Sequence, residues 1–212
     1  MRIVRLKGMP DALLLNETAR CVAEGGTIIF PTDTVYGIGC AAENDAAVES
    51  IFAAKRRPAD KPLAVHLASP ELAGRYAHRI SPAARKLVET FWPGPLTIIV
   101  ERKEGVCKAA ARGGATIALR CPDDDVCRTI LSSTGPLAAT SANISGAPAY
   151  DGGDDLAQLP EASMGIIAGT TKRRRESTVL DCSADDVRLV RQGALEAADV
   201  AHALAGIAPF TR

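Results

Sequence analysis

The sequence is poor in aromatic residues, carries no net charge and lacks any long apolar run. Only 4% of its 212 residues are aromatic, and this scarcity argues against a nucleic-acid surface that stacks on bases. Lys and Arg together number 25, as do Asp and Glu, so the formal net charge is zero. Bulk attraction to nucleic acid or to a membrane is therefore not indicated, although a local basic pocket is compatible with this balance.

The six cysteines contain no C-x-x-C pair, which argues against a metal site. We interpret them as reduced, small apolar residues. The N-terminal segment lacks the apolar core of a signal peptide, and no stretch approaches the roughly 18 consecutive apolar residues of a membrane helix. We therefore expect a soluble, cytoplasmic protein with no membrane partner. The length and the 47% hydrophobic content fit a single domain over residues 1–212.

Apolar runs of strand length alternate with segments of helical spacing, which predicts an α/β fold. Strands are expected at residues 3–6, 27–30, 63–67, 96–100, 116–120, 137–139, 164–168, 177–181 and 187–191. Helices are expected at residues 11–24, 44–55, 81–91, 123–133 (capped by Asp123) and 195–204, with shorter helical segments near residues 70 and 156. Open sheets with helical crossovers place ligands at the ends of strands, so we look there for the site.

The stretch at residues 27–40 combines a buried strand with a polar loop. Pro31 ends the strand, because proline has no N–H to give to a neighbouring strand. Hydroxyls, a carboxylate and glycines follow at once, beginning with Thr32, Asp33 and Thr34. This composition suits a ligand-binding strand end, and it equally suits an ordinary polar turn.

A second stretch, at residues 55–63, gathers four cations within seven residues and contains two prolines. The pattern alone fits a solvated basic turn that closes a helix, which the helix macrodipole favours. The prolines make the loop stiff, however, and stiffness is what a preorganised anion site requires. We expect Lys55 and Arg57 to be charged loop residues whose replacement by alanine keeps the fold.

Further stretches carry candidate ligand-binding groups. Arg120 ends a predicted strand, where its guanidinium fork can hold a carboxylate or a phosphate. Residues 140–146 (TSANISG) follow a short strand and can aim hydroxyls and N–H groups at an anion, without the lysine of a P-loop. His66 lies near a strand end, where a lone histidine is more often structural than functional. The basic run at residues 172–175 is by default a solvated loop.

Seven motifs, in this order, make the sequence resemble one family. They are PTDTVYG at residues 31–37, K-x-R-P-x-x-K-P-L at 55–63, FWPGPLT at 91–97, LRCP at 119–122, TSANISG at 140–146, STVLD at 177–181 and R-x-G at 191–193. Each motif is weak alone, but together they resemble the YrdC-like threonylcarbamoyl-AMP synthases over most of the chain. The resemblance implies a twisted, mixed parallel and antiparallel open sheet, flanked by helices, with a concave basic cavity.

The resemblance also implies a reaction. L-Threonine, bicarbonate and ATP, with Mg²⁺ on the ATP phosphates, would give threonylcarbamoyl-AMP and pyrophosphate. Downstream tRNA threonylcarbamoyl-transferase proteins would then modify the adenosine beside the anticodon, so tRNA would be only an indirect partner. These substrates are anionic, and their site needs cations and hydroxyl or N–H donors more than a nucleophile. The matched motifs hold no convincing Ser-His-Asp or Cys-His arrangement, and we see no acidic cage for a metal.

Carried over motif by motif, the resemblance assigns eleven site residues. The ATP-binding set is Lys55, Arg57, Lys61, Thr116, Ser141, Asn143 and Arg191, of which Lys55 and Arg57 are also assigned as catalytic. The threonine-binding set is Thr34, His66, Arg120 and Ser177, with Arg120 placed for the threonine carboxylate. No residue is assigned to a resident metal.

Two departures from the family pattern bear on the site. Gln192 follows Arg191 where many relatives have proline, which predicts a less rigid loop. We also expect the additional C-terminal domain of the longer family branch to be absent, so that a loop closes the site, with residues 172–175 as one candidate. Two alternative functions stay open: an RNA-binding module of the YrdC type, and a synthase or transferase that handles another carbamoyl adenylate. Thr34 and Arg120 favour the amino-acid substrate.

Overall fold

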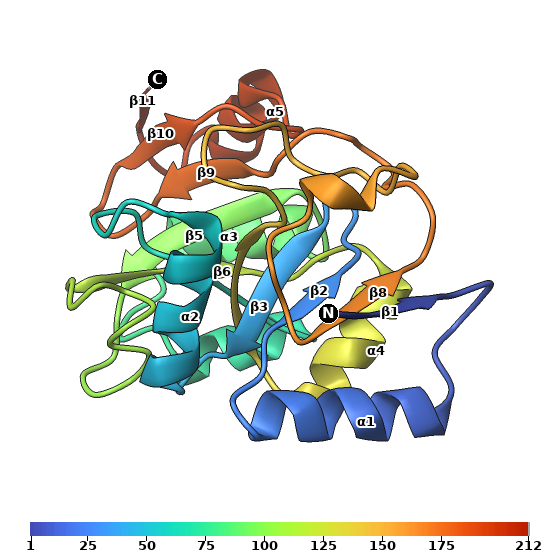
Figure 1. Cartoon of the computed structure of the whole chain (residues 1–212). Coiled ribbons are helices and arrows are strands. Elements are labelled where there is room, and N and C mark those ends of the chain that lie inside the picture. Colours follow the sequence, from blue (N-terminus) through green and yellow to red (C-terminus); the bar gives the residue numbers. More distant parts are fainter. Residues whose placement is uncertain (212) are drawn as a thin grey trace.

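A computed structural model describes residues 1–211, and an open sheet of eleven strands runs through that part of the chain (Figure 1). The strands are β1 (Arg2–Arg5), β2 (Ile28–Phe30), β3 (Gly37–Ala41), β4 (Ala64–His66), β5 (Leu96–Glu101), β6 (Thr116–Arg120), β7 (Leu137–Ser141), β8 (Met164–Ile167), β9 (Thr178–Asp181), β10 (Val187–Arg191) and β11 (Phe210–Thr211). Their order in the sheet is β1-β8-β2-β3-β7-β4-β6-β5-β9-β10-β11. Strand β8 runs parallel to β1 and β2, whereas β3 and β7 run antiparallel to both of their neighbours. The predicted mixed sheet is therefore confirmed.

Helices cover both faces of the sheet. They are α1 (Ala12–Ala23), α2 (Asp45–Lys55), α3 (Pro82–Phe91), α4 (Asp125–Thr134) and α5 (Ala197–Leu204), with 3₁₀ turns at Pro70–Arg75 and Leu156–Gln158. Ile28 and Phe30 of β2 join an apolar cluster with α1 and α4, which lie side by side (Figure 1). Ile29 belongs to a second cluster with α2, α3 and α5. Successive side chains of a strand point to opposite faces, so β2 separates the two layers.

Side-chain caps fix where the helices begin. Asn44 caps α2 and Ser81 caps α3, since each side chain accepts the N–H three residues further on. The predicted cap at Asp123 was wrong, because Asp124 caps α4 in the same manner, at 2.8 Å. Asp123 instead donates its backbone N–H to the carboxylate of Asp33 at 3.2 Å. Across residues 1–211, no helix has both the length and the apolarity needed to cross a membrane.

The polar loop predicted after β2 is shorter than expected, because Gly37–Ala41 form β3 and pair antiparallel with β2. A Cβ atom on Gly37 or Gly39 would lie 3.0 Å from the ring of Phe30, so only glycine lets the strand pack here without displacing that ring. Glycine weakens a strand in general, which concealed β3 in the sequence. Strand β7 also continues to Ser141, two residues beyond its predicted end, and the two-residue β11 was not predicted.

Candidate functional site

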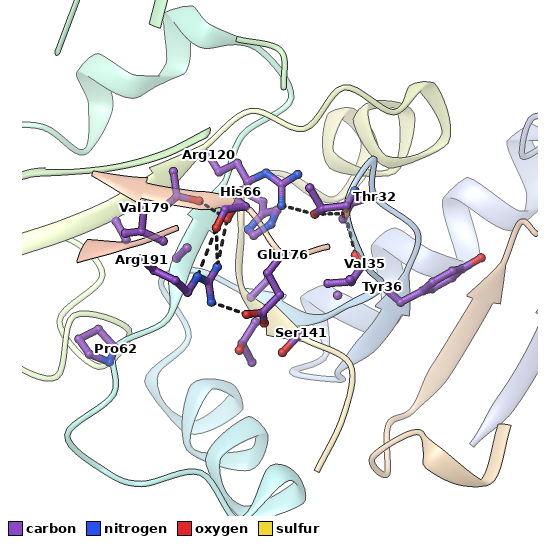
Figure 2. Close-up of a pocket in the computed structure, with 18 of the residues that line it drawn as sticks. Thr32, Val35, Tyr36, Pro62, His66, Arg120, Ser141, Glu176, Val179 and Arg191 are labelled. Atoms are coloured by element: carbon purple, nitrogen blue, oxygen red, sulfur yellow. Dashed lines mark hydrogen bonds and ion pairs between the residues drawn. The ribbon is translucent and has the colours of Figure 1, made fainter. Parts of the chain in front are cut away.

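A first cavity, of about 220 Å³, lies on one face of the central strands (Figure 2). Residues two apart along five strand segments line it: Ala64 and His66, Thr97 and Ile99, Ala118 and Arg120, Ala139 and Ser141, and Ser177 and Val179. Side chains two apart on a strand share a face, so the alternation of the sheet itself assembles this wall. The loop after β2 contributes Thr32, Thr34 and Val35, and β10 contributes Arg191.

A second cavity, of about 610 Å³, adjoins the first. Val35, Arg57, Ser141 and Glu176 line both cavities and form the boundary between them. The remaining walls of the second cavity come from Lys55, Lys61, Asn143, the 145–149 loop, Arg174, Arg175, Gln192 and Gly193. The basic stretch after α2 thus faces the TSANISG loop across the second cavity.

A buried ion pair lies at the edge of the first cavity. Arg120 Nη2 is 2.5 Å from Asp33 Oδ1, and Arg120 Nη1 donates to the Thr34 hydroxyl at 2.7 Å. Arg120 Nε donates to the Gly94 carbonyl at 3.3 Å. Three of the five N–H groups of the guanidinium are therefore used within the protein, and two remain for a ligand. The second oxygen of Asp33 accepts no hydrogen bond and lies 3.6 Å from Arg173 Nε.

His66 is buried and uncharged. Burial lowers its pKa to about 3, and the nearby positive charge of Arg120 acts in the same direction. Its ring packs edge-on against Phe30, and its Nδ1 has no hydrogen-bond partner. The neutral imidazole can therefore hydrogen-bond a polar ligand group, but it cannot act as a cation toward a carboxylate.

Arg191 is fixed by the residue that precedes β9. Its Nε and Nη2 donate to the Ser177 carbonyl at 3.2 and 2.9 Å, and its Nη1 donates to Glu176 at 2.8 Å (Figure 2). The Ser177 hydroxyl in turn lies 2.8 Å from the hydroxyl of Thr97. The 176–177 segment thus orients Arg191 and places a hydroxyl in the first cavity.

Lys55 is the last residue of α2 and is only 1% exposed. Its ammonium donates to the carbonyls of Ser141 and Asn143 and to Asn143 Oδ1, the last at 2.9 Å. A lysine has three donor hydrogens, so the loop after β7 takes all of them. Burial, together with the charge of Arg57, lowers the pKa of Lys55 to about 8, which leaves it protonated at neutral pH. Lys55 therefore ties α2 to the TSANISG loop, and a phosphate contact would have to replace one of these bonds.

Arg57 follows the end of α2 and makes different contacts from Lys55. Arg56 between them adopts a left-handed conformation (φ 50°) and ends the helix. Arg57 then donates to the carbonyls of Lys61 and Pro62, both at 2.9 Å, so it stiffens its own loop. Its half-buried guanidinium lines both cavities, and burial lowers its pKa. Lys61 is exposed at the mouth of the second cavity.

The structure brings ten of the eleven predicted site residues together. Thr34, Arg57, His66, Arg120, Ser141, Ser177 and Arg191 line the first cavity, and Lys55, Arg57, Lys61, Ser141 and Asn143 line the second. All four residues assigned to threonine share the first cavity. Thr116 lines neither cavity, because it begins β6, four residues before Arg120. The roles of these residues remain predictions.

Sequence reasoning missed two contributors to this site, Thr97 and Glu176, and it named Thr32 and Asp33 only as polar residues of the loop after the strand. Asp33 is the one carboxylate among the hydroxyls of the PTDTVYG motif, but its pairing with Arg120 was not predicted. Glu176 immediately precedes the STVLD motif, and no spacing or composition marks it. Its position was revealed only when the fold placed it between the two cavities.

An open mixed sheet with adjoining cavities that present cations, hydroxyls and backbone groups is the arrangement of an α/β protein that binds small anionic ligands. A family model described as "Telomere recombination" (Sua5/YciO/YrdC) matches residues 20–193. The chain belongs to this family, as the seven motifs predicted.

Known members of the family are similar over most of this chain. The threonylcarbamoyl-AMP synthase of Pyrococcus abyssi is 37% identical over 196 residues, which cover 91% of this chain and 58% of that protein. The synthase of Bacillus subtilis is 36% identical over 185 residues, which cover 85% and 54%. The crystal structure of P. abyssi Sua5 complexed with L-threonine matches with a TM-score of 0.90 at 33% identity, over 99% of this chain and 62% of that one. The chain thus spans somewhat more than half the length of these relatives.

Proposed function

We propose that this protein is a threonylcarbamoyl-AMP synthase. It combines L-threonine, bicarbonate and MgATP into threonylcarbamoyl-AMP and pyrophosphate, in the cytoplasm, for modification of the adenosine beside the tRNA anticodon. The observation that supports this most strongly is the division of the site: all four residues assigned to threonine line the smaller cavity, and Lys55, Arg57 and Lys61, three of the four cations assigned to ATP, line the larger one beside it. The names of its relatives support the same activity.

The first cavity takes the amino acid. Its volume of about 220 Å³ suits a ligand of that size. The two free N–H groups of Arg120 bind the threonine carboxylate, and a guanidinium fork matches a carboxylate well. The hydroxyls of Thr34 and Ser177 and the uncharged ring of His66 surround the remainder of the ligand with neutral hydrogen-bonding groups.

The second cavity takes the triphosphate, with Arg57 and Lys61 as cations of its wall. Arg191 lines the first cavity and pairs with Glu176 on the boundary, from which it reaches the phosphates. Lys55 holds the TSANISG loop, so that the groups of Ser141 and Asn143 meet the nucleotide in fixed positions. Because both cavities share Arg57 and Ser141, the two ligands meet at that boundary.

The reaction takes place where the two ligands lie side by side, at the boundary between the cavities. The threonine amine and bicarbonate give an N-carboxylate and water. An oxygen of this carbamate attacks the α-phosphorus of ATP, and the bond to the leaving pyrophosphate breaks. The protein holds the reactants in line and neutralises the charge on the pyrophosphate, and no protein nucleophile is needed. The product then passes to a transferase that acts on tRNA, so tRNA is not a substrate of this site.

Mass spectrometry of the product tests the proposal. The protein is incubated with ATP, Mg²⁺, bicarbonate and an equimolar mixture of amino acids, and each component is then omitted in turn. We expect threonylcarbamoyl-AMP as the main product, and pyrophosphate release that requires all four components and no tRNA. An obligatory tRNA, or pyrophosphate release without threonine, would contradict the proposal. A carbamoyl adenylate without an amino acid would favour the alternative synthase.

A further inference from the structure

Glu176 is the single carboxylate among the described residues that line the two cavities. It lines both cavities and so lies on the boundary between them, and Figure 2 shows its carboxylate beside Arg191. The other charged residues that line these walls are all cations: Lys55, Arg57, Lys61, Arg120, Arg174, Arg175 and Arg191. A negative charge at this point opposes the binding of anions, so its presence in an anion site requires an explanation.

The contacts of Glu176 are those of a bound anion. Its carboxylate accepts from Arg191 Nη1 at 2.8 Å, the end of the guanidinium that Ser177 leaves free. Its charge also favours the protonated form of Arg57, whereas the charge of Arg191 disfavours it. The carboxylate therefore compensates two guanidinium groups that would otherwise repel each other across the boundary.

The main chain of Glu176 is hydrogen-bonded, whereas its side chain is partly exposed. Its backbone carbonyl accepts the Ala194 N–H at 2.8 Å, so the main chain is anchored. The side chains of Glu176 and Arg191 are 39% and 43% exposed, in contrast to 0% and 5% for Asp33 and Arg120. A partly exposed ion pair stabilises a protein little, whereas breaking a buried one is far more costly.

We propose that Glu176 is a placeholder anion, which occupies Arg191 and compensates Arg57 until a phosphate-bearing ligand displaces its carboxylate. This inference rests on the proposed function, which puts phosphates in the second cavity, within reach of Arg191 across the boundary that Glu176 forms. Rotation of the Glu176 side chain frees Arg191 for a phosphate, and its return competes with pyrophosphate and speeds product release. The segment before β9 thus limits how tightly the site holds the anion it must release.

Binding of inorganic pyrophosphate without divalent metal tests the placeholder. Isothermal titration calorimetry compares the wild type with Glu176→Gln, which keeps the side-chain shape and removes the competing charge. We expect Glu176→Gln to bind pyrophosphate about three- to tenfold more tightly, which is what about 0.7–1.4 kcal/mol of lost competition gives. Glu17→Gln is the matched control, because Glu17 pairs with Arg2 at 2.9 Å and neither of these residues lines a cavity. It should change the dissociation constant less than twofold.

Unchanged or weaker pyrophosphate binding by Glu176→Gln would overturn the inference. So would a Glu176→Gln protein whose pyrophosphate binding is weakened only in the presence of Mg²⁺, because that result would make Glu176 a metal ligand. Glu176→Ala provides a second variant, and thermal melting verifies that both are folded. Failure of all proteins to bind pyrophosphate would overturn the inference together with the phosphate site. The product assay separates this inference from the proposed function. If Glu176→Gln forms threonylcarbamoyl-AMP but binds pyrophosphate as the wild type does, the placeholder role is wrong and the proposed function is unaffected.

Discussion

The Asp33 carboxylate and the Arg120 guanidinium form an ion pair from which solvent is almost excluded, with 2.5 Å between Oδ1 and Nη2 and side chains 0% and 5% exposed. The pair joins the loop after β2 to the end of β6, two segments nearly ninety positions apart. It also holds the guanidinium of Arg120 in the wall of the first cavity. Arg120 therefore has a structural role and a proposed binding role, and different variants separate them.

The structural role predicts a large loss of stability in Arg120→Met. The substitution leaves the Asp33 carboxylate buried and unpaired, apart from the N–H of Asp123 and the more distant Arg173. We expect the free energy of unfolding to fall by about 3–5 kcal/mol, measured by urea denaturation. The double variant Asp33→Asn/Arg120→Met should recover much of this loss. A double variant as unstable as the single one would show that the pair is not the cause.

The binding role predicts a selective defect in Arg120→Lys. Lysine keeps the charge opposite Asp33 but cannot present a planar fork, so a second carboxylate is held less well. We expect the KM for threonine to rise about tenfold or more, while the KM for ATP stays within about twofold. Arg128→Lys is the control, because Arg128 pairs with Asp125 at the surface. Equal changes for both substrates would remove Arg120 from the amino-acid site.

The sequence predicted the strands and helices well, because hydrophobic period and capping residues act locally. It failed at β3, since the reason for Gly37 and Gly39 is the ring of Phe30, which reaches them only after the hairpin has formed. Asp123 and Asp124 could not be distinguished for the same reason: the N–H of Asp123 is committed to Asp33, ninety residues away. Predictions from the local sequence cannot include contacts between residues so far apart in the chain.

The site was predicted as a set of residues but not as an arrangement. Motif resemblance found ten residues that line the cavities, yet it treated Lys55 and Arg57 as equivalent cations. They differ because Lys55 is still part of α2 and is buried against the TSANISG loop, whereas the left-handed Arg56 ends the helix and Arg57 lies at the cavity boundary. Glu176 was missed because its role depends on the position of Arg191, which comes from another strand.

Arg57→Ala tests the phosphate site. Arg57 is half-buried and its bonds go to two carbonyls of an exposed loop, so we expect only a small change in stability. Pyrophosphate release at saturating threonine should fall by about two orders of magnitude, as is typical when one preorganised charge-stabilising group is lost. If near-normal synthesis accompanied a loss of tRNA binding, the RNA-binding alternative would be preferred.

Because His66 is buried and uncharged, we expect the protein to lose stability on acidification. Its pKa is lowered from 6.5 to about 3 in the folded protein by burial and by Arg120. Between these values the unfolded chain binds a proton that the folded chain does not, so the stability rises with pH across this window and falls on acidification. Replacing His66 by Asn removes this contribution. We expect the plot of unfolding free energy against pH, between about 3.5 and 6, to be shallower in His66→Asn by up to about 1.4 kcal/mol per pH unit. Parallel plots would mean that His66 is protonated in the folded state.

Lys55→Met separates a buried tie from a phosphate ligand. The sequence suggested that Lys55, like Arg57, stands free in a loop and can be removed without loss of stability; its 1% exposure at the end of α2 corrects that placement. The substitution deprives two carbonyls and the Asn143 side chain of their common donor, so we expect the free energy of unfolding to fall by about 1–3 kcal/mol.

The matched control is Lys61→Met, which removes a lysine from the same cavity at an exposed position and should leave stability within about 0.5 kcal/mol. If Lys55 acts by holding the TSANISG loop, Lys55→Met should also raise protease sensitivity at residues 141–146, whereas loss of a phosphate ligand would leave that loop protected. If Lys55→Met is stable and protease-resistant and has lost only ATP-dependent activity, Lys55 contacts the phosphates directly. That outcome would require the ammonium to leave its three oxygens when ATP binds.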